Sequence, residues 1–382
     1  MEWALHSLGS IMKKHDVSRF NHTFPFCRLP AGTPNIRQRW IWESSKWTLA
    51  AIIAIMVMVM IAGNTAAKSP GGGALAGNRY RVIISTDIGG GDEDDIQSMV
   101  HYLLYSDLFD TEGIISSPPQ KGRKKDILEV IDEYQKDYTN LKNHSDKYPE
   151  PNYLRSIAKQ GAINPAPEKG YSSPTEGSKW IIHCAKKKDP RPLYVLVWGA
   201  ITDVAQALRD EPGIKGKIRV YFIASWNQKN DQSAFMYIDK DHKDLWLIHN
   251  NSTFRGWYMG GNQNGDLGNK SFVDRHVKNH GALGKYFAPL KGGSIKMGDT
   301  PSYAFLLRGI PDDPTKESWG GRFVKRKGRS NWWIDDPDPA LAEGGHHGAK
   351  TVNMWRRQYL SDWQKRMDRC KEKAPPGSTK KQ

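Results

Sequence analysis

The chain has 382 residues, of which 38% are hydrophobic, and this combination excludes a chain that is disordered throughout. Lys and Arg number 56 against 41 for Asp and Glu, so the net charge is +15. At ~150 residues per domain, the length allows one large domain or two ordinary ones. The cysteines Cys27, Cys184 and Cys370 form neither a CxxC pair nor a Cys/His cluster, which excludes a disulfide scaffold and disfavours a structural zinc site. Whether Cys184 and Cys370 pair in an oxidising compartment is left open.

The N-terminal part of the chain contains an uncharged apolar run of 16 residues at 48–63. Basic residues precede this run and small residues follow it, as is typical of an export signal. The run is shorter than the ~20 residues of a comfortable membrane span. We therefore expect residues 1–67 to be a signal peptide with a long n-region, cleaved near Ala67. The alternative is an uncleaved membrane anchor, and either way the rest is expected to be exported, periplasmic or extracellular.

Without residues 1–67, which hold seven Lys/Arg and three Asp/Glu, the chain still has a net charge of +11. A basic protein suggests nucleic-acid binding. However, the lysine clusters of this chain are scattered, at 121–125, 186–188 and 371–381. No binding motif with interleaved aromatic residues accompanies them. We expect solvated faces and no nucleic-acid partner, with membrane contact only through an uncleaved anchor.

The first predicted elements form a βαβ unit after a Gly/Ala/Pro-rich linker at 68–78. The β-branched run 80–86 predicts a strand. Apolar residues then recur at helical spacing from Ile96 to Leu104, which predicts an amphipathic helix. Residues 112–117 predict the next strand. Since a βαβ unit places its strands in parallel, a parallel sheet is expected.

The alternation of strands and helices continues toward the C-terminus. Further strands are predicted at 193–198, 218–224 and 245–249, and helices at 126–134, 177–186, 202–208, 301–307 and 355–369. Long insertions are expected at 140–176, 252–297 and 309–352. The sequence thus predicts a single α/β domain over 79–370, an open, mostly parallel sheet flanked by helices, and a basic disordered tail over 371–382.

The loop between the first strand and the first helix is strongly acidic, with five carboxylates in the nine residues 87–95. Ligands of open α/β sheets bind at the carboxyl ends of strands. Three glycines at 89–91 let the backbone turn sharply. Crowded carboxylates repel unless a cation offsets them, and oxygen ligands on an irregular loop favour calcium over magnesium. A calcium site is therefore predicted; the alternative is a helix N-terminus with its acids in solvent. A phosphate-binding loop is excluded because the loop is negative and lacks the Gly-Lys-Ser/Thr motif.

This acidic segment, Thr-Asp-Ile-Gly-Gly-Gly-Asp-Glu-Asp-Asp at 86–95, resembles the Asp-Pro-Gly-x-Asp-Asp signature of nucleoside hydrolases. With Gln97 and Ser98 it is more similar to the nucleoside-hydrolase-like domain of bacterial cellulose-binding exported proteins. Three later segments resemble further motifs of these proteins, at 197–203, 298–302 and 319–323. The resemblance spans about 79–370 and implies a nucleoside-hydrolase-like, Rossmann-like fold.

The resemblance also implies a site. Calcium would be held by the carboxylates of Asp87, Asp95 and Asp299 and by the carbonyl of Trp198. Asp94 would bind a sugar hydroxyl. Asp87 would take the proton of a metal-bound water, which attacks an anomeric carbon through an oxocarbenium-like state.

The sequence departs from the family in the half of the site that would bind a nucleoside. Ser85 stands where the family often has Asp, and Gly298 where many members have a His that assists base departure. The ribose-gripping Ala-Glu-x-Asn is missing; 233–237 is the nearest stretch, and Asn227 or Asp231 are candidate substitutes. A non-nucleoside glycoside, or a loss of catalysis, is therefore an alternative.

Other chemistry-bearing residues have simpler interpretations. His346 and His347 beside Glu343 suggest either a transition-metal site or, preferably, a solvated loop. The acids at 335–338 suggest an acidic turn, with lining of a cleft as the alternative. Several tryptophans are candidates for stacking on sugar rings, and of these Trp198 and Trp226 are favoured because they follow strands; the others are Trp257, Trp332 and Trp333.

We therefore expect an exported, calcium-dependent hydrolase of glycosyl or N-glycosyl bonds. Its substrate would be a small glycoside, a nucleoside or an oligosaccharide, bound by Asp94, Asn227 and Trp226. The alternative is a non-catalytic protein that binds a cellulose-type polysaccharide on the same fold. The presence of all three acids, Asp87, Asp95 and Asp299, favours catalysis. A homo-oligomer is compatible with the sequence.

Overall fold

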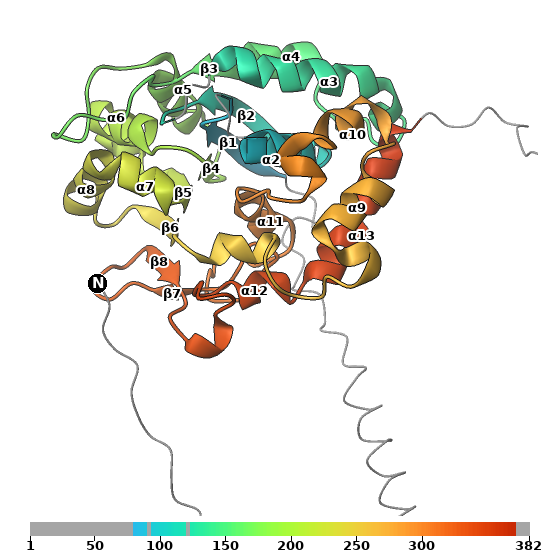
Figure 1. The fold of residues 1–382 in the computed structure, drawn as a ribbon. Helices are drawn as coiled ribbons and strands as arrows, with labels where there is room; N and C mark the ends of the chain where they lie inside the picture. The colour runs from blue at the N-terminus through green and yellow to red at the C-terminus, as the bar shows by residue number, and fades with distance from the viewer. Residues whose placement is uncertain (1–78, 90–92, 120–122, 372–382) are drawn as a thin grey trace, which may run out of the picture. The chain divides into compact units, whose positions relative to one another are not determined.

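Eight strands form one sheet in the order β3-β2-β1-β4-β5-β6-β8-β7 (Figure 1). Neighbouring strands are parallel except β7 and β8, which are antiparallel. The strands are β1 (Tyr80–Thr86), β2 (Phe109–Ser116), β3 (Ala158–Gln160), β4 (Leu193–Val197), β5 (Ile218–Ile223), β6 (Trp246–Asn250), β7 (Phe323–Lys325) and β8 (Trp332–Asp335). The predicted open, mostly parallel sheet is confirmed.

The computed structural model describes residues 79–89, 93–119 and 123–371. The predicted signal or anchor, the linker and all but the first residue of the basic tail lie outside the described residues. The described residues belong to one compact unit. None of its helices is both long and apolar enough to cross a membrane.

Helices cover both faces of the sheet (Figure 1). They are α2 (Glu93–Leu103), α3 (Lys124–Lys142), α4 (Pro151–Ile157), α5 (Glu176–Ala185), α6 (Thr202–Asp210), α7 (Trp226–Asn230), α8 (Gln232–Asp241), α9 (Asn269–His276), α10 (Gly281–Phe287), α11 (Pro301–Leu307), α12 (Lys350–Asn353) and α13 (Arg356–Met367). In β1, Val82 and Ile84 pack with α2, α3 and α11, whereas Ile83 packs with α5 and α6. Successive side chains of a strand point to opposite faces, so a strand covered on both sides carries a continuous apolar run, as Val82–Ile84 does in β1.

The insertions contain structure that periodicity did not predict. The prediction of an acidic turn at 335–338 is wrong for Asp335, because this residue ends strand β8. Its carboxylate accepts the backbone N–H groups of Asn251 (3.0 Å) and Thr253 (2.9 Å). Its neighbour Asp336 is paired with Arg322 at 2.8 Å. These acids therefore hold loops together. Cys184 and Cys370 are both buried free thiols, so they do not pair.

Asp203, in the first turn of α6, ties this helix to the loop that follows β3. It is fully buried and accepts the Ala162 N–H (3.0 Å) and the Thr175 hydroxyl (2.5 Å). Burial raises the pKa of Asp203 to about 6, against an ordinary value of 3.8, although these two partners lower it.

This raised pKa predicts a pH-dependent stability. The folded state binds the Asp203 proton more tightly than the unfolded chain does, so stability is highest below pH ~4 and falls by about 3 kcal/mol as the pH rises to ~6. The Asp203→Asn variant, which cannot ionise, should lack this contribution. Urea unfolding of the wild type and the variant at several pH values measures it, with the exposed Asp210→Asn as control. A difference between wild type and variant that stays constant from pH 4 to pH 7 would contradict the assignment.

Candidate active site

The ends of β1 and β4 define the centre of the candidate site. In open parallel sheets the ligand crevice lies where the strand order reverses, and here β1 is flanked by β2 on one side and β4 on the other. Asp87 follows β1 and Trp198 follows β4. The Trp198 N–H donates to the Ser85 carbonyl at 2.7 Å. A Cβ built on Gly199 would lie 2.8 Å from the Cβ of Asp87, so the two strand ends are in close contact.

Asp95 is folded back toward the end of β1. The Thr86 hydroxyl donates to a carboxylate oxygen of Asp95 and accepts the Ile88 N–H at 3.1 Å. One hydroxyl thus connects the last residue of β1, the loop and the first turn of α2. Asp87 and Asp95 are only 1% and 4% exposed. A short polar side chain at the end of the strand therefore positions both the loop and its carboxylate.

Asp299 joins this region from far along the chain. The hydroxyl of Ser98, which lies one turn after Asp95 on α2, donates to the Asp299 carboxylate at 3.3 Å across 201 residues of sequence. The Asp299 carbonyl accepts the Ser302 hydroxyl at 2.7 Å. That hydroxyl in turn accepts the Trp198 indole N–H at 2.8 Å. Asp299 is therefore connected both to α2 and to the end of β4.

Asn227, predicted to contact substrate, holds the neighbouring strand ends. Its amide nitrogen donates to the carbonyls of Trp198 and Ile223, the latter at 3.0 Å. The Trp198 carbonyl keeps a second lone pair, so this hydrogen bond leaves it able to coordinate an ion. Trp226, one residue earlier, is 48% exposed. The start of α7 therefore presents an aromatic ring close to the end of β5.

Asp94 forms an ion pair that the sequence did not predict. The Lys291 ammonium lies 2.8 Å from a carboxylate oxygen of Asp94. The backbone N–H of Lys291 donates to the Glu93 carboxylate at 2.6 Å. Lys291 has a φ of 50°, in the left-handed region that costs a non-glycine residue energy. A lysine thus partly neutralises the N-terminal acids of α2, and any sugar hydroxyl at Asp94 would share the carboxylate with it.

The chemistry of the donor set suits a hard cation. Asp87, Asp95 and Asp299 offer buried carboxylate oxygens, and burial of such groups is unfavourable unless charge or hydrogen bonds compensate. Another acid of the loop at 87–95, Asp92, lies outside the described residues. Across residues 79–89, 93–119 and 123–371, however, no group of three or more His, Cys, Asp or Glu side chains is already arranged to hold a metal ion. That finding also applies to the alternative site at His346.

Several candidates for sugar contact are buried. Trp198 cannot stack on a sugar because its indole is fully buried and hydrogen-bonded to Ser302. Three other candidates are also buried: Trp257, Trp332 and Trp333. Asp231 is wrong as a ribose ligand, since it is buried and accepts the Thr202 hydroxyl (2.7 Å) and the Ala166 N–H (2.9 Å). The stretch 233–237 lies within α8. Of the candidates, Trp226 keeps an accessible ring.

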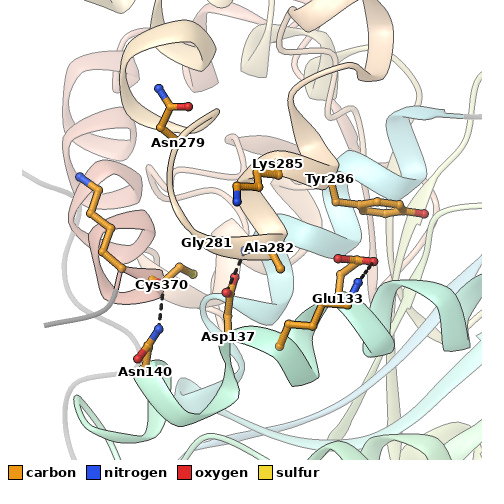
Figure 2. A pocket seen from close by; sticks show the side chains of 11 residues that line it. Glu133, Asp137, Asn140, Asn279, Gly281, Ala282, Lys285, Tyr286 and Cys370 are labelled. Carbon is orange, nitrogen blue, oxygen red and sulfur yellow. Dashed lines mark hydrogen bonds and ion pairs between the residues drawn. The ribbon is translucent and has the colours of Figure 1, made fainter.

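A cavity of about 710 Å³ lies between α3, α10 and the short helix Asp368–Cys370 (Figure 2), and its lining includes none of the candidate residues. In Figure 2, the carboxylate of Asp137 points to the start of α10, where it accepts the Ala282 N–H at 2.8 Å. The amide of Asn140 donates to the Cys370 carbonyl at 3.1 Å. These polar groups fasten α10 and the C-terminal segment to α3, so they have a structural role.

The chain is similar to a known protein family and to a solved structure. A family model described as "Cellulose-binding Sde182, nucleoside hydrolase-like domain" matches residues 81–323, more than half of the chain. Among proteins with curated functions, none is similar enough to count as a match. A solved structure from Saccharophagus degradans, a nucleoside hydrolase-related hypothetical protein associated with carbohydrate metabolism, has 26% sequence identity and a TM-score of 0.59, covering 77% of this chain and 72% of that one.

Two further solved structures share a lower similarity. The inosine-uridine preferring nucleoside hydrolase from Bacillus anthracis has 17% identity and a TM-score of 0.43, covering 75% of this chain and 99% of its own. The type III effector protein XopQ, complexed with adenosine diphosphate ribose, has 9% identity and a TM-score of 0.49, covering 77% and 95%.

Proposed function

Because the chain belongs to the family of the nucleoside hydrolase-like domain of cellulose-binding Sde182, we propose that it is an exported, calcium-dependent hydrolase of glycosyl or N-glycosyl bonds. The expected nucleoside hydrolase-like fold is confirmed. One observation supports the proposal most strongly: Asp299 reaches α2 through Ser98 from 201 residues away, beside the loop that carries Asp87 and Asp95. A cation shared by Asp87, Asp95 and Asp299 would require Asp299 to lie at this edge of the sheet.

In the proposed reaction, Asp87, Asp95, Asp299 and the Trp198 carbonyl would hold a calcium ion. Bound calcium supplies the positive charge that lowers the pKa of a water molecule. Asp87 would accept the proton of the attacking water, whose oxygen would bond to the anomeric carbon. The bond to the leaving group breaks through an oxocarbenium-like state, which the nearby carboxylates stabilise by their negative charge.

The sugar would be held by the groups around this centre. Asp94 would accept a sugar hydroxyl while sharing its carboxylate with Lys291. Asn227 would contribute mainly by orienting the Trp198 carbonyl, leaving its side-chain oxygen as an acceptor. The exposed ring of Trp226 would stack on a sugar ring of the substrate.

Trp226→Ala is expected to weaken the binding of a cello-oligosaccharide roughly tenfold, about 1.4 kcal/mol. The change removes the apolar stacking surface and leaves the acids in place. Titration of the oligosaccharide followed by calorimetry measures the effect. Met236→Ala serves as control, because Met236 is 50% exposed on α8 and has no place in the proposed site. Unchanged affinity in the Trp226 variant would remove this residue from the site.

The proposed activity is tested by incubating the purified chain with nucleosides and with plant or algal oligosaccharides. Released reducing sugar is measured with calcium and with a chelator. Release that depends on calcium is the expected result. If no substrate releases sugar in either condition, the hydrolase proposal is wrong.

The second candidate function is non-catalytic carbohydrate binding. The description of the family as cellulose-binding favours it, and that family also supports an extracellular location. The two functions are distinguished by incubation with cellulose, since a binding protein would sediment with the polysaccharide and release no sugar. A nucleic-acid partner is not proposed.

A further inference from the structure

The residue before Asp299 is Gly298, and two aromatic rings occupy the space beside it. A Cβ built on Gly298 would lie 3.3 Å from the Phe254 ring and 3.8 Å from Cε1 of Tyr258. Both aromatic residues come from the segment around the short helix Thr253–Trp257, which lies in an insertion after β6. The Tyr258 ring therefore packs against the loop that carries a proposed calcium ligand.

Tyr258 is held in place by its backbone and by a lysine. Its carbonyl accepts the Asn269 side-chain amide at 2.8 Å. Its N–H donates to the Arg255 carbonyl at 3.2 Å. The Lys296 ammonium lies 4.6 Å from the centre of the Tyr258 ring. The ring is partly buried.

The contact of the Tyr258 ring with Gly298 brings it next to Asp299, and its surroundings keep the phenol protonated. The pKa of Tyr258 is raised to about 12, chiefly by burial; Asp94 and Asp299 act in the same direction and Arg255 opposes them. The phenol thus interacts with an acid on α2 and with another before α11. It is fully protonated at neutral pH, so it can serve as a hydrogen-bond donor. Even with this pKa it is a stronger acid than water, whose pKa is about 15.7.

We propose that Tyr258 is a catalytic residue that donates its hydroxyl proton to the leaving-group oxygen of the scissile glycosidic bond. This inference rests on the proposed function. The water oxygen bonds to the anomeric carbon while the bond from that carbon to the leaving oxygen breaks. The bonding electron pair goes to the leaving oxygen, which takes the Tyr258 proton. Asp87 holds the proton from the water and returns it through solvent to the phenolate.

A pair of substrates that differ only in the leaving group tests this role. An alkyl glycoside needs a proton at its departing oxygen. The nitrophenolate of a nitrophenyl glycoside departs as a stable anion and needs no proton. Tyr258→Phe is expected to lower kcat for the alkyl glycoside by roughly 100-fold. For the nitrophenyl glycoside, kcat should change by less than about threefold. A change of that size is comparable to the few tenths of a kcal/mol expected from indirect structural effects. Tyr286→Phe, a partly buried tyrosine of α10, is the matched control.

The outcomes separate this inference from the proposed function. Equal loss of kcat on both substrates, or no loss on either, overturns the role of Tyr258 while hydrolysis by the wild type stands. If the variant also loses calcium binding in a calorimetric titration, its defect is structural and the inference is overturned. If the wild type cleaves neither substrate, the proposed function itself fails and the role of Tyr258 fails with it.

Discussion

Replacement of Asp87 by Asn is expected to lower kcat by roughly 10³-fold, within the range for loss of a general base that also supports charge in the transition state. Asn keeps the size of the side chain and one oxygen, but it cannot accept the proton of the water and brings no negative charge to the cation. Because Asp87 is buried beside Gly199, the substitution changes charge with little change in packing. Sugar release and calcium affinity are the two measurements.

The control for this variant is Asp274→Asn, an acid on the exposed side of α9 that pairs with Lys270 at 3.2 Å. It should keep wild-type kcat and calcium affinity. If Asp87→Asn releases sugar as fast as the wild type, Asp87 is not the base.

Gly199→Ala is expected to lower activity roughly 100-fold without removing any proposed ligand. The added Cβ would lie 2.6 Å from the Ser117 hydroxyl, 2.7 Å from the Pro118 carbonyl and 2.8 Å from the Cβ of Asp87. No real Cβ tolerates such contacts, so Asp87 or the loop after β2 must move. A misplacement of about 1 Å is enough to cost this factor in rate. Overpacking should also lower the free energy of unfolding by about 1–3 kcal/mol.

Gly216→Ala provides the matched control, since a Cβ at this position meets nothing within 4 Å. Sugar release, calcium affinity and urea unfolding are compared in the two variants. Wild-type calcium affinity and activity in Gly199→Ala would show that the contact between the ends of β1 and β4 does not position Asp87.

The sheet could be predicted where its elements carry a local pattern. Strand β1 and helix α11 have the predicted bounds 80–86 and 301–307, and α2 begins three residues before the apolar run predicted from Ile96. Strand β8 is four residues long and lies within the segment 309–352, which the sequence predicts as an insertion. Two tryptophans and an isoleucine pair it with β6, a contact across distant segments that leaves no local periodicity.

The candidate site was predictable as a set of residues but not as a set of contacts. The loop that holds Asp87 and Asp95 was evident because acids and glycines are concentrated between a strand and a helix. The position of Trp198 at a strand end did not reveal that its indole points inward to Ser302. Residue spacing also gave no signal for Lys291, whose pairing with Asp94 depends on how an insertion folds.

The positioning residues were missed for a related reason. Thr86 and Ser98 carry short hydroxyl groups, whose role depends on which carboxylate lies within reach. Thr86 lies next to Asp87, and Ser98 one turn after Asp95, so hydroxyls at these spacings around an acidic loop are the signal that could have identified them. Tyr258 offered no such signal, because only the folded insertion brings its ring to Gly298.

Calorimetric titration of calcium into the full chain tests the central claim most directly, with Asp299→Asn measured in parallel. Asp299 is the acid whose contribution depends entirely on the fold bringing it to α2. The account predicts one calcium ion bound per wild-type chain and an affinity lowered by at least about tenfold in the variant, a loss of about 1.4 kcal/mol. A wild-type chain that binds no calcium, or a variant that binds it equally well, would contradict the account.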